Sequence, residues 1–234
     1  MVHKILQLFL FISFSALAQD FGSEKLFSKE IGKNIKAYRL KSQQAHNDQD
    51  FGRAKALFDS LISNVVNNSY MDDFKVKKLS GRTIRFYDFK KPVFLITYAS
   101  WCTPGVGEIP ALNEIADKYH KEIDFIILFW DSKSKVRKAT RDYSKRFTIV
   151  YVDEMENNQD HIVETMKHSL GFPTTFFIDE NKKIMDVRRG VLHPYNEEFS
   201  VSYNLNYNAF SNGIALLKNI VLKKETSSFS EKKP

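Results

Sequence analysis

The sequence predicts an α/β protein in which a mixed β-sheet is flanked by helices and preceded by a helical extension. Two observations carry this prediction. Apolar residues recur at helical spacing over the first part of the chain, and from Phe74 onward short apolar runs alternate with amphipathic segments. Apolar runs buried on both faces are typical of parallel strands, whose connections are helices that cover the sheet.

The composition narrows the class of protein further. The chain has 234 residues, of which 43% are hydrophobic and 27% charged, with 9 Gly and 6 Pro. This is enough apolar side chain for a packed core, so collagen-like and disordered classes are excluded. The net charge of +7 comes from basic residues interleaved with acidic ones, so we expect no nucleic-acid partner. The single cysteine excludes an intrachain disulfide and a cysteine-rich zinc site, and we expect no cofactor and no metal.

Residues 1–18 have the pattern of a secretory signal peptide. A short positive region ends at Lys4, an apolar stretch covers Ile5–Phe14, and Ala16 and Ala18 occupy the positions that a signal peptidase reads. The apolar run is shorter than the ~20 residues needed to span a bilayer, so we expect no stable membrane insertion. The sequence therefore predicts an exported protein, periplasmic or secreted, whose lone thiol meets an oxidising environment.

The mature chain is predicted to have a helical extension over residues 19–72, an α/β domain over 73–222 and a disordered tail over 223–234. In the extension, apolar residues at three- and four-residue spacing indicate two helices separated by the polar stretch Ser42–Asp50. The tail has little apolar surface to bury, which favours disorder.

The domain is predicted to begin with a β-hairpin around the turn Ser80-Gly81, because apolar residues alternate on both sides of it. Apolar runs of strand length and longer amphipathic segments follow in turn, which predicts parallel strands joined by helices. The expected order is strand, helix, strand, helix, strand, helix, strand, strand and helix, over residues 92–98, 106–120, 123–130, 133–146, 147–152, 158–170, 174–178, 184–188 and 208–222.

Cys102 is the candidate nucleophile. It lies between a buried strand and the helix expected from Val106, and Pro104 suits the first turn of that helix. Unpaired N–H groups at a helix N-terminus favour an anion, so this position predicts a lowered thiol pKa and a reactive thiolate. The alternative is a small buried side chain without chemistry, and spacing alone does not decide between the two.

Two separated motifs resemble those of a known family. The segment Ala99–Pro110 (ASWCTPGVGEIP) resembles the active-site segment of thioredoxin-like proteins, in particular exported redoxins of the TlpA/ResA type, whose pattern is W-C-x-P-C-x-x-E-x-P. The segment Gly171–Asp179 (GFPTTFFID) resembles the cis-proline segment of the same family, and Gly107–Asn113 is similar to secreted redoxins of Bacteroidetes-type bacteria. The resemblance covers about residues 74–222 and implies a thioredoxin-like fold that acts on protein thiols or disulfides.

The resemblance also implies roles for single residues. Pro173, expected in the cis form, would face Cys102 and leave neighbouring backbone groups free to pair with a substrate strand. Glu108 matches the family's glutamate, and burial would raise its pKa and suit it to shuttle a proton; the alternative is an exposed carboxylate in a first helical turn. Trp101 is expected to pack beside the thiol. The implied catalytic residues are Cys102 and Glu108, and the implied substrate-binding residues are Trp101, Pro104, Phe172, Pro173 and Thr174.

The main departure from the family pattern is Gly105, which occupies the place of the resolving cysteine. Cys102 alone forms a mixed disulfide with a substrate but has no second thiol in the chain to release it. We therefore expect monothiol exchange in which an external thiol reductant or redox partner resolves the intermediate.

Two other functions stay open. A redox-inactive binding or chaperone-like module would keep the fold without turnover, and the bulky Phe172 before Pro173 would narrow access to the thiol. A one-cysteine peroxidase is the other alternative. Peroxiredoxins carry Thr and Pro where this chain has Ala99 and Leu95, which counts against it.

Overall fold

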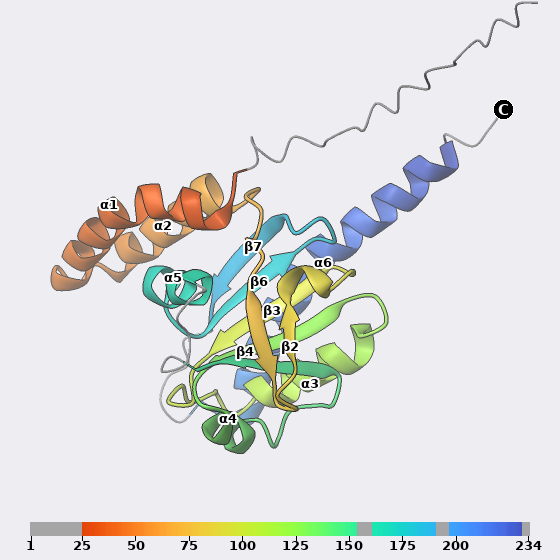
Figure 1. The fold of residues 1–234 in the computed structure, drawn as a ribbon. Helices are drawn as coiled ribbons and strands as arrows, with labels where there is room; N and C mark the ends of the chain where they lie inside the picture. The colour runs from red at the N-terminus through yellow and green to blue at the C-terminus, as the bar shows by residue number, and fades with distance from the viewer. Residues whose placement is uncertain (1–24, 154–160, 191–196, 231–234) are drawn as a thin grey trace, which may run out of the picture.

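The structure is a computed structural model that describes residues 25–153, 161–190 and 197–230. The expected signal peptide lies outside these residues. Within them the chain forms a seven-stranded mixed sheet with helices on both faces and two helices ahead of the first strand (Figure 1). This architecture confirms the predicted fold class. None of the helices within the described ranges combines the length and hydropathy needed to cross a membrane.

The extension consists of α1 (Phe27–Asn47), α2 (Phe51–Leu61) and a short π-helix, η2 (Ile62–Val66). Helices α1 and α2 lie side by side at one end of the sheet (Figure 1). The break between them comes only at the end of the polar stretch that was expected to separate them. Ser42 and Ala45 are buried on the inward face of α1, so tertiary packing keeps this polar part of the chain helical.

The strands are arranged in the order β2-β1-β5-β4-β3-β6-β7. The central β3, β4 and β5 are parallel, and antiparallel strands flank them on both sides. In the antiparallel pair β3–β6, Thr97 lies opposite Thr174, so the end of β3 and the start of β6 meet at one edge of the sheet. The strand bounds are β1 Lys75–Lys78, β2 Thr83–Arg85, β3 Val93–Tyr98, β4 Asp124–Trp130, β5 Phe147–Val152, β6 Thr174–Ile178 and β7 Ile184–Arg189.

Each face of the sheet has its own hydrophobic core. Helices α1, α2 and α5 cover one face, and α3, α4 and α6 cover the other, with α6 running behind the sheet in Figure 1. Successive residues of β6 point into different cores. Phe176 packs edge-on against Phe27 of α1, whereas Phe177 packs against Phe94 of β3. The helix bounds are α3 Glu108–Tyr119, α4 Lys133–Ala139, α5 His161–Leu170 and α6 Phe199–Ser230; a 3-10 turn, η3, covers Phe86–Asp88.

Helix α6 is longer than predicted at both ends. The sequence predicted a helix over 208–222 and a disordered tail from residue 223, whereas the structure is helical from Phe199 to Ser230. At the C-terminal end no Pro or Gly follows Gly213 within the helix, so the chain has no local signal to stop. At the N-terminal end Ser202 and Asn206 are polar but buried, which hides the apolar periodicity that marks a helix.

Candidate functional site

The sheet brings the two sequence motifs to the same edge. Strand β3 leads into the loop that carries Cys102, and β6 begins directly after the cis peptide bond Phe172–Pro173. Because Thr97 and Thr174 are paired, the loop and the cis-proline segment extend from neighbouring strand ends. The neighbouring strand β7 supports the second segment, where the Gly190 N–H donates to the Pro173 carbonyl oxygen at 3.1 Å.

Asp131 fixes the loop in front of the thiol. It follows β4, and its carboxylate accepts hydrogen bonds from the Ser100 hydroxyl at 2.8 Å and from the Ser100 backbone N–H. The Cys102 N–H donates to the Ala99 carbonyl oxygen at 2.9 Å, which closes a turn around Cys102. A carboxylate at the end of a neighbouring strand therefore sets the position of the nucleophile, and only its place after a buried strand marks it in the sequence.

The thiol does not lie at a helix N-terminus. Helix α3 begins at Glu108, six residues after Cys102, so the expected stabilisation of a thiolate by the helix is missing. Partial burial raises the pKa of the Cys102 thiol and is the largest effect. A backbone hydrogen bond at Ala99 lowers this pKa, whereas the negative charge of Asp131 raises it further. The expected lowering of the thiol pKa is therefore wrong.

Glu108 is a buried carboxyl group, with 5% of its surface exposed. Its Oε2 accepts a hydrogen bond from the Gly105 N–H at 3.2 Å, and its buried Oε1 has no hydrogen-bond partner in the described structure. Burial raises the pKa of Glu108 to about 7, and the bond from Gly105 only partly opposes this. At neutral pH this carboxyl group can therefore both take up and release a proton.

Tyr143 belongs to the same surroundings but was not among the predicted residues. Burial is the main cause that raises the pKa of its hydroxyl, and the negative charges of Glu108 and Cys102 contribute next. Its ring packs edge-on against Phe147 at 5.9 Å. Tyr143 lies in the turn after α4, among charged residues and outside any motif, so the sequence carries no signal for its role.

The start of α6 supports the active-site loop from behind. The Gly107 N–H donates to the Ser202 hydroxyl at 3.0 Å. A Cβ atom at position 107 would lie 2.1 Å from the backbone nitrogen of Tyr203, so only glycine fits between the loop and the helix. The contact escaped sequence-based prediction because the first turns of α6 were not recognised as helical.

The expected substrate-binding residues differ in exposure. Trp101 is 68% exposed, so its indole lies mostly in solvent instead of packing beside the thiol, and Val106 beyond it is 61% exposed. Pro104 is partly buried. Along the chain, Cys102 is thus followed and preceded by exposed apolar side chains that a partner could contact.

The cis-proline segment is more enclosed. Thr174 is buried, and its hydroxyl donates to the Gly171 carbonyl oxygen at 2.9 Å. Phe172 packs against the core under α1, whereas Cys102 packs against the core on the other face of the sheet. The expected obstruction of the thiol by Phe172 is therefore not supported. Within the described residues no group of three His, Cys, Asp or Glu side chains could hold a metal ion.

Comparisons with known proteins identify the family and the fold of the chain. The sequence model of the AhpC/TSA family matches residues 68–187, just over half of the chain. The chain is 28% identical over 124 residues to the thioredoxin-like protein YneN of Bacillus subtilis (strain 168), an alignment that covers 51% of this chain and 69% of YneN. It is 30% identical over 132 residues to the thiol-disulfide oxidoreductase ResA of Geobacillus thermodenitrificans (strain NG80-2), covering 55% of this chain and 72% of ResA.

Among solved structures, a putative thiol:disulfide interchange protein DsbE from Chlorobium tepidum superposes with a TM-score of 0.50 and 24% identity. The superposition covers 64% of this chain and 97% of that one, and it shows the fold. The lone cysteine agrees with a family site that has lost its resolving thiol. The chain therefore belongs to the AhpC/TSA family, as a thiol-disulfide oxidoreductase-like protein with the thioredoxin fold.

Proposed function

We propose that the protein is an exported redoxin that exchanges thiols and disulfides through Cys102 alone, with an external thiol completing each cycle. The observation that carries the proposal is a partly buried thiol in the loop after β3, followed at the start of α3 by a buried carboxyl group whose pKa is about 7. The thiol is a weak nucleophile by itself because its pKa is raised, so it needs a group that accepts its proton.

In the first step Glu108 accepts the thiol proton while the Cys102 sulfur attacks a substrate disulfide. The substrate S–S bond breaks, one substrate sulfur joins Cys102, and the other leaves as a thiolate that takes up a proton. In the second step an external thiolate attacks the substrate sulfur of this mixed disulfide. A disulfide then joins the external thiol to the substrate, and Cys102 returns to the reduced state.

Export is supported by residues 1–18, whose charged, apolar and small-residue regions follow each other in the order of a signal peptide. The external thiol that the cycle needs would then be met outside the cytoplasm. N-terminal sequencing of the exported chain tests this, with Gln19 expected as the first residue; a chain retained in the cytoplasm with Met1 intact would contradict it.

Capture of a model disulfide tests the monothiol mechanism. The purified chain is mixed with an uncharged peptide disulfide, and mass spectrometry follows the mixed disulfide and its release by added dithiothreitol. We expect wild type to form and release the adduct, Cys102→Ser to form none, and Glu108→Gln to form it ~10–100-fold more slowly at neutral pH. The proposal would be overturned if wild type captured the disulfide no faster than free cysteine does at the same pH.

A second candidate, a redox-inactive binding module, is favoured by two observations. The pKa of the Cys102 thiol is raised, and the neighbouring Trp101 and Val106 are exposed apolar side chains. Partner binding that survives Cys102→Ser but is lost in Trp101→Ala, together with no capture of disulfides by wild type, would favour this function over exchange.

A further inference from the structure

A concave basic surface lies beside the cis-proline segment. It is a cleft of about 470 Å³ between α1, the C-terminal end of α5 and the end of β7. Three permanent cations line it, Arg39 from α1, Lys167 from α5 and Arg189 from β7, together with the imidazoles of His46 and His168. None of the described residues that line the cleft is acidic. We call this surface the basic cleft.

The two arginines of the basic cleft are held in place without an ion pair. Arg39 donates to the carbonyl oxygen of His168, and Arg189 donates to the Tyr38 hydroxyl at 2.8 Å while its guanidinium lies 4.1 Å from the centre of the Phe58 ring. Neither has a carboxylate within ion-pair distance in the described part of the chain. Cations that neutral partners orient in a concave surface attract anions from solution.

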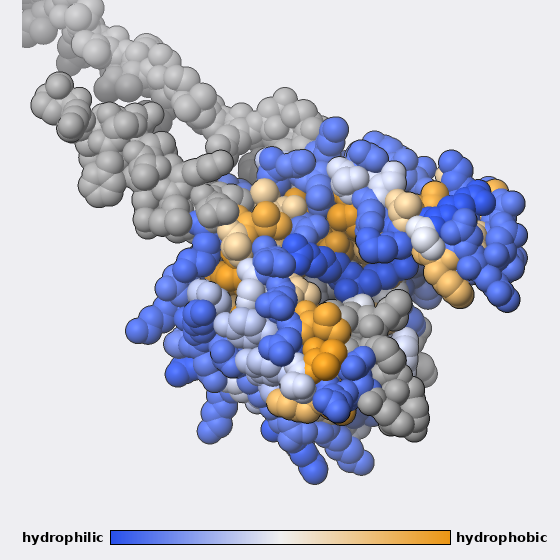
Figure 2. Space-filling view, turned by 180° about the vertical axis from the view of Figure 1, so that it is seen from behind, coloured by the Kyte–Doolittle hydropathy of each residue, from blue (hydrophilic) through white to orange (hydrophobic). Residues whose placement is uncertain are grey.

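Carboxylates lie next to the basic cleft but not in its described lining: Asp59 and Asp186 line the neighbouring pocket that shares Arg189 with it. The Glu164 carboxylate lies 3.8 Å from the His168 imidazole and is not part of the lining. The Lys167 ammonium group lies over the ring of Trp130, 4.9 Å from its centre. On the face shown in Figure 2, hydrophilic side chains follow the junction between the N-terminal helices and the body. Within the described lining itself, the charged side chains are therefore all basic.

The basic cleft borders the cis-proline segment. Arg189 is paired with Thr174, the residue directly after Pro173, and the next residue, Gly190, donates to the Pro173 carbonyl oxygen. Gly171, two residues before Pro173, itself lines the cleft. An extended chain bound at the cis-proline segment therefore reaches the cleft within a few of its own residues.

We infer that the basic cleft binds an acidic segment of the protein on which Cys102 acts. The inference rests on the proposed function, because it takes the occupant to be the substrate of the same site. The two arginines come from separate elements, Arg39 from α1 and Arg189 from β7, which matches several carboxylates on a peptide better than one small anion. In this arrangement α1 completes a substrate surface that the α/β domain alone lacks.

The test measures binding without the thiol. Full-length Cys102→Ser protein is titrated into two fluorescein-labelled peptides that carry a central Ser and, on one side, either a run of Glu or the same run of Gln, and anisotropy gives both affinities. We expect the Glu peptide to bind at least ~10-fold more tightly at low ionic strength, and this advantage to shrink as salt is added.

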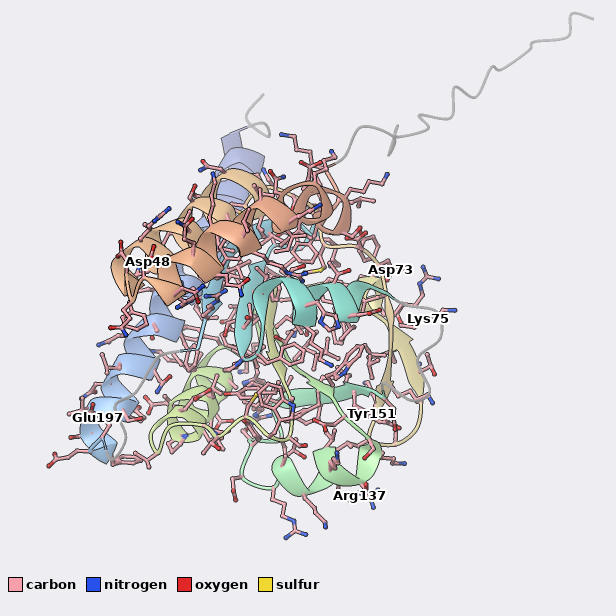
Figure 3. The ribbon with its side chains drawn as sticks, turned by 90° about the vertical axis from the view of Figure 1, so that its left-hand side faces the viewer. Asp48, Asp73, Lys75, Arg137, Tyr151 and Glu197 are labelled. Atoms are coloured by element: carbon pink, nitrogen blue, oxygen red, sulfur yellow. The ribbon has the colours of Figure 1, made fainter. Side chains whose placement is uncertain are left out.

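Variants locate the effect. Gln43→Glu places a negative charge on the exposed α1 side of the basic cleft without removing an arginine contact, and we expect it to weaken the Glu peptide about 5-fold or more and leave the Gln peptide unchanged. The matched control, Arg137→Gln with Lys138→Gln, removes two exposed cations from α4, at the opposite end of the molecule from Asp48 at the tip of α1 (Figure 3), and should leave both affinities unchanged.

Equal affinities for the two peptides would overturn the inference, as would an equal loss of affinity for the Glu peptide in the α4 control. Complete displacement of the Glu peptide by inorganic phosphate at matched ionic strength would also overturn it, because the cleft would then be a small-anion site. Failure of the proposed function is recognised separately. Capture of the uncharged disulfide needs Cys102 and not the cleft, whereas peptide binding needs the cleft and not Cys102.

Discussion

Glu108 gives the fold a pH dependence that can be measured without any substrate. Its pKa is about 7 in the folded chain against a usual value of 4.5, so between these pH values the folded chain holds a proton that the unfolded chain has lost. The free energy of unfolding should therefore fall as pH rises from about 4.5 to about 7, by about 3 kcal/mol, and stay level above that. Urea denaturation at several pH values measures this change.

The matched variant is Glu108→Gln, which keeps the shape of the side chain and cannot ionise. Its free energy of unfolding should lack the Glu108 contribution, so the difference between variant and wild type should change over that pH interval and be constant outside it. A parallel decline in both proteins would show that other groups cause it.

The sequence proposes single site residues where a motif names them. Cys102 and Glu108 follow from the W-C-x-P pattern and its spacing. Tyr143 and the anchoring role of Asp131 were not predictable, because each depends on a loop that packing brings to the thiol from elsewhere in the sequence. The predicted lowering of the Cys102 pKa was wrong because partial burial, the largest effect, raises this pKa, and α3 begins too far from the thiol to oppose it.

At the scale of elements, α6 lies so close to the active-site loop that adding one methyl group at Gly107 should destabilise the fold. Gly107→Ala would place its Cβ atom 2.1 Å from the backbone of Tyr203, so the loop or the helix must move. We expect a loss of about 1–3 kcal/mol in the free energy of unfolding, measured with urea, together with altered reactivity of the Cys102 thiol.

Gly32→Ala is the control for this change. Gly32 lies inside α1 with nothing within 4 Å of an added Cβ atom, so alanine should stabilise the chain by up to about 1 kcal/mol through helix propensity. A Gly107→Ala protein as stable as wild type, with unchanged thiol reactivity, would show that the loop does not depend on α6.

Helices and strands were predictable where the hydrophobic pattern of their own residues determines their structure. The strands β3 and β4 are apolar over almost their whole length, and both were predicted to within a residue. The start of α6 was missed because Ser202 and Asn206 are polar but buried. The Ser202 hydroxyl accepts from the Gly107 N–H, and the Asn206 side-chain amide donates to the Ser202 carbonyl oxygen at 2.8 Å. Burial of polar side chains is decided by a partner, which one segment of sequence does not show.

At the scale of the whole molecule, the N-terminal helices and the sheet share one core, so they should unfold together. Phe27 and Ile31 of α1 are fully buried in the same cluster as Phe176 of β6. Trp101 and Trp130 both lie outside the extension, so their fluorescence reports the sheet, while far-UV circular dichroism also reports α1 and α2. We expect the two signals to give one transition with the same midpoint.

Two substitutions in α1 sharpen this prediction. Phe27→Ala should lower both midpoints together, by about 3–5 kcal/mol of unfolding free energy, because it empties a fully buried site. Leu40→Ala, at a position 72% exposed on the same helix, should change neither. Loss of helical signal before the fluorescence change would show that the extension unfolds on its own.

The support of the active-site loop by α6 has a consequence for the order of synthesis. A ribosome delivers Cys102 and the Gly105–Glu108 bond partners long before Ser202 and Tyr203, which hold the loop from behind. A nascent chain thus carries its only thiol for about a hundred residues before the last described helix can fix the surrounding loop. The loop around Cys102 therefore gains this support only after the first turns of α6 have been made, and a chain truncated before Ser202 would carry the thiol without it.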